Sequence, residues 1–290
     1  MSVAIPLPTR PMLRYHGGKW TQRKRILEWM KTPHRVFVSW FTGGGSVEIM
    51  KPRVHTEVWN DRWSLVVNLY RVLRDRNAAA ELERQLTLTP YSRSEWNYVN
   101  SIDWSAVQDP IELARLTIFR SYSGFGSGST NPDYTTGFRG SSSRSGAGPS
   151  RDWMNYPKQI MRFHERLQGI TFENLHYRKL PDSHDTTETL HYADPPYVLG
   201  TRNSNGQVYA YEMSDADHVE FLNVARRMEG QMIISAYEND LYNDLLPDWK
   251  KVQYAAKADG MKKRIETLYI NPYCVSMQSR AKKVVQKNLF

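Results

Sequence analysis

A glycine-rich turn between two predicted strands limits the folds open to this chain more than any other feature. Residues 36–38 predict a strand that runs into residues 41–46 (Phe-Thr-Gly-Gly-Gly-Ser), and the apolar residues at 47–50 predict the start of a helix. A second strand is predicted at 57–59 and ends at Asn60-Asp61. A strand, a glycine turn, a helix, a strand and an acid, in this order, open a Rossmann-like sheet.

These residues suit a ligand that carries a ribose. Glycines let the backbone approach a ligand closely, and Asp61 can accept hydrogen bonds from both ribose hydroxyls. The turn lacks the Gly-Lys-Ser/Thr ending of a phosphate-binding loop, which disfavours ATP. A simple tight turn would also explain the glycines alone, but their spacing to Asp61 favours a binding site.

The rest of the chain continues the α/β pattern around an insertion. Helices are predicted at 21–30, at 66–73, at 111–120 and after the capping-box pattern at 214–217. Further strands are predicted at 170–172, 189–193, 231–235, 252–254 and 265–270. We therefore expect an α/β domain of residues 1–80 and 169–290, with a Rossmann-like sheet, interrupted by a mainly helical and loop-rich domain of residues 81–168.

The predicted insertion is basic and rich in serine and glycine. Residues 120–166 carry seven Lys and Arg side chains against three acids, together with several aromatic residues. Basic and aromatic side chains on a pliable backbone suit contact with phosphates and bases, although a solvated surface loop is the alternative. We expect residues 140–150 to be mobile. The candidate DNA-binding residues are Arg120, Tyr122, Arg139, Arg144, Arg151 and Lys158.

Composition restricts the class of partner and the location. The formal net charge of +9 and the pI near 9.5 indicate an anionic partner, with nucleic acid favoured over a membrane because no long apolar run occurs. Cys274 is the only cysteine, which excludes an internal disulfide, and the eight histidines lack the spacing of a metal site. We expect no metal, no membrane partner, a monomer, and a cytoplasmic location in a bacterial or phage-infected cell.

The sequence Asp194-Pro195-Pro196-Tyr197 directly follows the predicted strand at 189–193. An exocyclic amino group on a base is a poor nucleophile because its lone pair is delocalised into the ring. Asp194 and the Pro195 carbonyl can accept its two N–H groups, and Tyr197 offers a ring for stacking. Such a site is reached only by a base flipped out of its duplex. The ordinary end of a strand at a proline is the alternative interpretation.

Together these motifs resemble the Dam-type (alpha, D12) class of N6-adenine DNA methyltransferases, over residues 13–272. That family has a Trp-Ala-Gly-Gly-Lys segment where this chain has residues 15–19, Tyr-His-Gly-Gly-Lys. The glycine turn at 41–46, Asn60-Asp61 and the tetrapeptide at 194–197 also match. One departure is that Ser39-Trp40 replaces the family's Glu-Pro before the glycine turn.

The resemblance implies methyl transfer from S-adenosylmethionine to the amino group of a flipped adenine in double-stranded DNA. It implies catalytic roles for Asp194, Pro195, Pro196 and Tyr197. It implies cofactor binding by Tyr15, His16, Gly17, Lys19, Phe41, Gly43, Gly45, Ser46, Asp61 and Asp194. Because the Ser/Gly-rich middle matches the family least, we expect short or relaxed sequence specificity.

Two other functions remain open at this point. N4-cytosine methylation would use the same grip on an exocyclic amine, although Asp at the first position of the tetrapeptide resembles the adenine enzymes. A non-catalytic basic nucleic-acid-binding module could keep the same fold as a scaffold. It would not bind S-adenosylmethionine.

Overall fold

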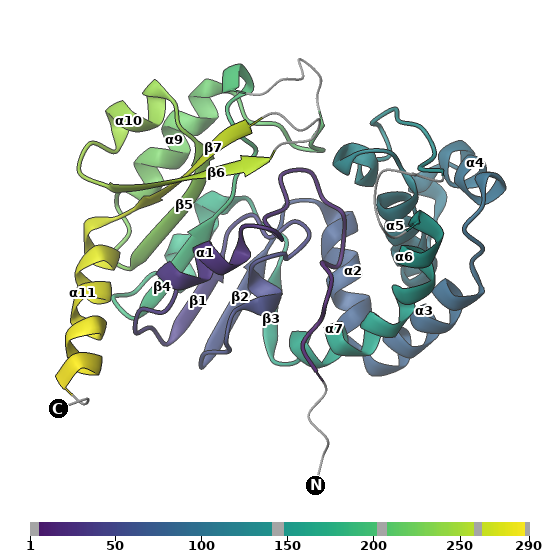
Figure 1. Ribbon diagram of the computed structural model, residues 1–290, viewed down its shortest axis with the longest axis horizontal. Coiled ribbons are helices and arrows are strands. Elements are labelled where there is room, and N and C mark those ends of the chain that lie inside the picture. The colour runs from purple at the N-terminus through teal and green to yellow at the C-terminus, as the bar shows by residue number, and fades with distance from the viewer. Residues whose placement is uncertain (1–5, 141–147, 202–207, 258–262, 288–290) are drawn as a thin grey trace, which may run out of the picture.

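A seven-stranded sheet forms the centre of the molecule in the computed structural model, which describes residues 6–140, 148–201, 208–257 and 263–287 (Figure 1). The strands are β1 (Val36–Ser39), β2 (Thr56–Asn60), β3 (Ile170–Glu173), β4 (Thr189–Ala193), β5 (Gln231–Tyr237), β6 (Lys250–Lys257) and β7 (Lys263–Ile270). Their order is β3-β2-β1-β4-β5-β7-β6; β7 runs antiparallel to both β5 and β6, whereas the other neighbouring pairs are parallel. The expected Rossmann-like α/β sheet is confirmed.

The two faces of the sheet bury alternate residues of each strand in different apolar clusters. Phe37 of β1 packs in a cluster that includes residues of α1 (Arg23–Trp29) and α2 (Ser64–Arg74). Val38, the next residue, packs in a second cluster with residues of α9 (Asp215–Ala225) and α10 (Asp240–Leu245). Helices α8 (Leu180–His184) and α11 (Pro272–Lys287) complete the part of the chain around the sheet. This alternation is the period of two that a sheet covered on both faces requires.

The inserted region is a group of helices beside the β3 edge of the sheet (Figure 1). It contains α3 (Arg76–Leu88), α4 (Arg93–Ser101), α5 (Pro110–Ser123), α6 (Pro149–Asn155) and α7 (Ile160–Leu167). Helix α2 packs against both α5 and α7, so one apolar cluster runs from the sheet into this region. The expected boundary at residue 80 falls inside α3, whereas the boundary at 168 follows the end of α7.

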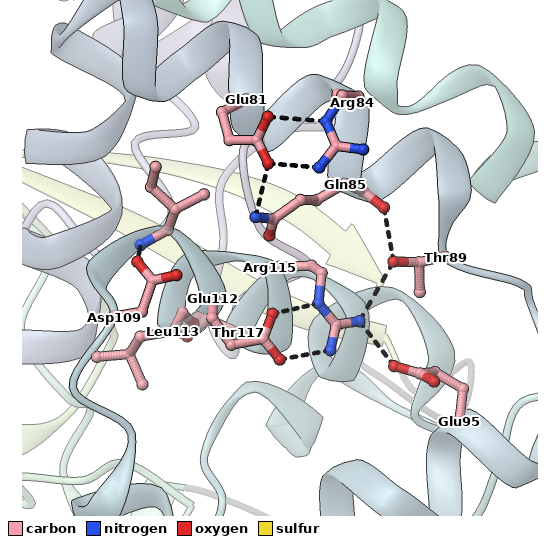
Figure 2. Close-up of polar contacts among 11 residues, drawn as sticks. Glu81, Arg84, Gln85, Thr89, Glu95, Asp109, Glu112, Leu113, Arg115 and Thr117 are labelled. Carbon is pink, nitrogen blue, oxygen red and sulfur yellow. Dashed lines mark hydrogen bonds and ion pairs between the residues drawn. The ribbon is translucent and has the colours of Figure 1, made fainter.

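Arg115 of α5 joins three elements of the inserted region (Figure 2). Its Nε lies 2.6 Å from Glu112 of the same helix, and its Nη1 lies 2.7 Å from Glu95 of α4. The same nitrogen donates to the hydroxyl of Thr89 at the end of α3. Because Arg115 is nearly buried, these charge-assisted bonds stabilise the packing of the helices more than a surface pair would.

The N-terminal segment 9–14 lies against the inserted region. The Thr9 backbone N–H donates to the side chain of Gln159, and Arg10 forms an ion pair with Asp152. The Arg14 backbone N–H donates to the hydroxyl of Ser121 at 2.7 Å. The main-chain carbonyls of this segment accept hydrogen bonds from two tyrosine hydroxyls of the inserted region, those of Tyr122 and Tyr156. The segment that leads into residues 15–19 is therefore fastened to the helices of the inserted region.

Two local predictions differ from the structure. The helix expected after the glycine turn is only a short 3-10 turn, Glu48–Met50, because Lys51 is extended before Pro52. Of the loop expected to be mobile, residues 141–147 lie outside the described residues, and Pro149 and Ser150 belong to the first turn of α6. The capping box predicted at Ser214 is confirmed at the start of α9.

Short 3-10 turns connect several elements: Trp104–Ala106, Ser127–Thr130, Pro157–Gln159, Tyr177–Lys179 and Leu199–Thr201. Within the described ranges, no helix combines the length and the apolar character needed to cross a membrane.

Candidate active site

The order of strands and turns in the sheet brings the predicted motifs to one edge. Strands β1 and β4 are parallel neighbours, with Ser39 opposite Tyr192, so the chain leaves both strands on the same side. The glycine turn follows β1, Asp61 follows β2 and Asp194 follows β4. Because the strand order reverses between β1 and β4, this is the position where open α/β sheets bind ligands.

Asp61 holds the glycine turn in place through backbone hydrogen bonds. Its Oδ2 accepts from the Gly43 N–H at 2.7 Å, and its Oδ1 accepts from the Trp63 N–H at 2.8 Å. Gly43 and Gly45 have φ values of 52° and 61°, in the left-handed region that favours glycine. A Cβ at Gly43 would lie 2.9 Å from the ring of Tyr15, so the close approach of that ring also requires glycine.

Burial raises the pKa of Asp61 to about 6, against the lowering effect of the two backbone N–H groups. A carboxylate offers about four lone-pair directions, and the backbone bonds of Asp61 use two of them. Asp61 can therefore hold the glycine turn and still accept hydrogen bonds from a ligand.

Asp194 is paired with Lys19, which comes from the N-terminal motif. The Lys19 Nζ lies 2.9 Å from Oδ1 of Asp194 and 4.6 Å from the centre of the Tyr197 ring. Burial lowers the pKa of Lys19, but the charges of Asp194 and Glu266 outweigh this effect and raise it. Burial raises the pKa of Asp194 to about 6, although Lys19 opposes this shift. The motif at 15–19 and the tetrapeptide at 194–197 thus meet in one ion pair.

Tyr197 is fixed by residues from two other strands. Its hydroxyl donates to Oε2 of Glu266 in β7 at 2.6 Å. Its ring packs edge-on against Tyr237, at the end of β5, with the ring centres 4.6 Å apart. Buried Tyr197 therefore has a defined orientation before any ligand binds.

Two adjoining cavities lie at this edge of the sheet, and Asp194 lines both of them. The larger has a volume of about 780 Å³, including the part open to solvent, and is lined by Asp61, Trp63, Tyr177 and Pro196 among others. The smaller, of about 370 Å³, is lined by the glycine turn together with Lys19 and Glu48. Aromatic and acidic side chains line the larger cavity, and side chains of both charges line the smaller one.

A wide groove lies on the other side of residues 15–18. It has a volume of about 1890 Å³ including open solvent, and Tyr197, Tyr237 and Glu266 line one part of it. Residues of the inserted region, Phe125 and Tyr134 among them, line another part. The tetrapeptide at 194–197 thus lines the cavities with its first residue and the groove with its last.

The other predicted cofactor residues lie around these cavities. His16 and Gly17 line both the smaller cavity and the groove, Ser46 does the same, and Phe41 lines the two cavities. Gly17 has a φ of 73°, and a Cβ there would lie 2.5 Å from the hydroxyl of Tyr209. Pro195 is buried, and Gly45 packs against Met12 and Trp59 within the turn.

The structure corrects two of the expected DNA contacts. Arg120 is 1 % exposed and donates to the main-chain carbonyls of residues 131, 132 and 134. Tyr122 is 4 % exposed and bonds to the carbonyl of Pro11. Both side chains are buried by these contacts, so they support the loop and the N-terminal segment and do not reach a phosphate in this conformation.

The remaining expected DNA contacts have different surroundings. Arg151 and Lys158 are exposed, and Arg139 forms an ion pair with Asp152 at 3.2 Å. Arg144 lies outside the described residues. Among the residues that are described, no group of three or more His, Cys, Asp or Glu side chains is placed to hold a metal ion.

Sequence reasoning missed several residues that line the site. Tyr209 lines both cavities and the groove, and its ring centre lies 6.4 Å from that of Tyr15. Trp63 and Tyr177 belong to the larger cavity. No local pattern marks these aromatic residues, because they reach the site from loops and turns whose course only the fold determines.

The family model of the D12 class N6 adenine-specific DNA methyltransferases matches residues 15–259. The chain belongs to this family. Comparison with curated proteins gave no significant match. Membership makes the protein an adenine-specific DNA methyltransferase, which decides against N4-cytosine methylation and against a basic module without activity. The matched range includes the glycine turn, Asp61 and residues 194–197. The seven-stranded sheet of the chain agrees with a methyltransferase fold.

Proposed function

We propose that this DNA adenine methyltransferase uses S-adenosylmethionine and acts on an adenine flipped out of double-stranded DNA. The observation that carries the proposal is the position of residues 194–197. Asp194 lines the two cavities at the ends of β1 and β2, and Tyr197 lines the groove shared with the inserted region. A cofactor on one side and a base on the other would therefore meet at this tetrapeptide.

The residues of the two cavities fit this cofactor. The aromatic lining of the larger cavity suits a flat adenine, and Asp61 has lone pairs left for ribose hydroxyls. Tyr15, above Gly43, and Lys19 would lie near the other end, with the backbone of residues 43–45 beneath the methionine part. When bound, the cofactor supplies an electrophilic methyl group on a positively charged sulfur.

The chain's own residues would grip the target amino group. Asp194 would accept one N–H and the Pro195 carbonyl the other, so that the nitrogen lone pair points away from the ring of the base. Tyr197, fixed by Glu266, would stack on the base. The Asp194 carboxylate can accept this bond while it stays paired with Lys19, because the ion pair leaves other lone pairs of its oxygens free. Alignment of the reacting groups would supply much of the rate acceleration.

The depth of this position supports base flipping. Pro195 and Tyr197 are buried, so a base that stays stacked within a duplex could not contact them. Phe125, with 71 % of its surface exposed, lines the part of the groove formed by the inserted region. An exposed aromatic side chain there is placed to contact the bases of an opened duplex.

Short or relaxed sequence specificity remains part of the proposal. The groove wall formed by the inserted region contains Gly126, Ser127 and Gly128, which offer few side-chain groups for reading base edges. We propose that a single chain is the active unit, because one chain supplies both cavities and the groove. Mapping every modified base in unmethylated DNA would test the specificity, and one long methylated motif would contradict it.

Substitution of the acidic residue tests the function directly. Asp194→Ala should lower methyl transfer by at least about 1000-fold, since it removes a hydrogen-bond acceptor aimed at the reacting group. Calorimetric binding of S-adenosylmethionine should largely persist, because Asp61 and the glycine turn stay in place. Asp182→Ala, at an exposed acid in α8, is the matched control and should keep full activity. Methyl transfer by Asp194→Ala at the wild-type rate would refute the proposal.

A further inference from the structure

A buried carboxylate with no role in the proposed function, that of Glu48, faces the smaller cavity. Glu48 lies in the 3-10 turn directly after the glycine turn and is 2 % exposed. Its Oε1 accepts from the Ser39 hydroxyl at 2.7 Å, and its Oε2 accepts from the Val47 N–H at 3.1 Å. Lys19 and Asp194 line the same cavity. The side chain is therefore fixed, and it lies beside the proposed cofactor.

Glu48 has no cationic partner among the residues that the structure describes. Lys19 pairs with Asp194, and Arg166 pairs with Glu57 while it donates to the main-chain oxygen of Glu48. Burial raises the pKa of Glu48 to about 7. A buried charge is costly unless it is paired, so this carboxylate would gain from a cationic group supplied by a ligand.

The site of Glu48 coincides with the departure from the family pattern. The resembled enzymes have a glutamate at the position of Ser39, and here the Ser39 hydroxyl lies within hydrogen-bond distance of Glu48. Glu48, which follows the glycine turn in the sequence, thus places a carboxylate beside the end of β1.

The arrangement of the cavities indicates which part of the cofactor Glu48 would meet. Asp61 lines only the larger cavity, Glu48 lines only the smaller one, and Asp194 lines both. If Asp61 holds the ribose and the reaction occurs at Asp194, the smaller cavity holds the amino-acid end of the cofactor. That end carries one carboxylate and one ammonium group, which match the opposite charges of Lys19 and Glu48.

We propose that Glu48 binds the α-ammonium group of the methionine part of S-adenosylmethionine. This inference depends on the proposed function and adds a binding residue to it. The Ser39 hydroxyl and the Val47 N–H would hold the carboxylate in position while the ammonium group neutralises its charge.

Calorimetry with three ligands tests the proposal on the whole chain. S-adenosylmethionine carries the ammonium group and the sulfonium, S-adenosylhomocysteine carries only the ammonium group, and 5′-methylthioadenosine carries neither. Glu48→Gln should weaken the first two by about 10-fold or more, the typical effect of losing a bond between charged groups, and leave the third unchanged. Glu28→Gln, at an acid on α1 with a side chain 63 % exposed, is the control and should change none of them.

The other outcomes each contradict the proposal. Weakening of S-adenosylmethionine alone would place the carboxylate at the sulfonium. Equal weakening of all three ligands would show that Glu48 only maintains the shape of the cavity, and unchanged binding would show that it contacts no ligand. Glu48→Ala, measured with the same three ligands, repeats the test if the Gln variant folds poorly. If the wild-type protein bound none of the ligands, the proposed function would itself fail, which separates the two failures.

Discussion

The cofactor-side edge of the sheet and the inserted helical region use charged residues differently. At the sheet edge, Asp61 and Asp194 each lie at a strand end and face a cavity. In the inserted region, Arg115 and Arg120 point inward and bond to side chains and carbonyls of the same region. A charge that is buried beside a cavity is available to a ligand, whereas one buried among helices stabilises the fold. A buried charged residue therefore indicates function in one region and structure in the other.

Substitution of Gly43 should give the largest effect of the comparison. Gly43→Ala would place a Cβ 2.9 Å from the Tyr15 ring at a φ of 52°, which is strained for any L side chain. We expect the affinity for S-adenosylmethionine to fall about 100-fold, because backbone strain and the clash with Tyr15 would together cost about 2–3 kcal/mol at the cavity wall. Isothermal titration calorimetry measures it. Gly200→Ala, where a Cβ would meet nothing within 4 Å, is the matched control.

Two arginines of the inserted region allow a matched test of structural charge (Figure 2). Arg115→Met should lower the free energy of unfolding by about 2 kcal/mol, since it leaves two partly buried glutamates without their partner. Arg84→Met removes an exposed pair with Glu81 and should lower the free energy of unfolding far less. Urea denaturation of both variants measures the difference. Equal losses would show that burial does not set the value of these pairs.

The pH dependence of methyl transfer should reflect the buried acids at the sheet edge. The pKa values of Asp61 and Asp194 are both raised to about 6 by burial, so both carboxylates gain protons as the pH falls below that value. A protonated Asp194 is a much weaker acceptor for the amino N–H than the carboxylate, and methyl transfer should fall about tenfold for each pH unit below 6. The rate of labelled methyl transfer between pH 5 and 8 measures this. A rate that stays constant to pH 5 would contradict an ionised Asp194 in catalysis.

Phe125 should show the smallest of these effects. Phe125→Ala should raise the KM for DNA about fivefold, because stacking on a base contributes about 1 kcal/mol or more, and should leave cofactor binding unchanged. Leu88→Ala, at another exposed apolar residue, 67 % exposed and at the end of α3, is the control. An unchanged KM in Phe125→Ala would show that Phe125 does not contribute to DNA binding.

The sequence predicted the sheet and its strand ends well because these depend on local patterns. The strand at 189–193 has the predicted bounds, and the glycine turn, Asp61 and Asp194 meet at one edge. Alternating apolar residues and glycines at strand ends are patterns of a few neighbouring residues, so they can be recognised in a single sequence.

The inserted region was predicted less well because its contacts join residues far apart in the chain. Arg120 was expected to contact DNA, but its guanidinium donates to the carbonyls of residues 131, 132 and 134. Basic residues in a serine-rich segment have the same composition whether they face DNA or a loop. Tyr209 and Glu48 were missed because their place in the site depends on the course of loops and on one departure from the family pattern.

The fastening of segment 9–14 to the inserted helices has a mechanical consequence for the reaction. The same stretch continues into His16 and Lys19, which line the groove and the smaller cavity. Any rotation of the helices on closing around a duplex would therefore also move segment 9–14 and, through it, Lys19, which pairs with Asp194. Binding of DNA to the inserted helices would then be coupled to the position of the Asp194 side chain.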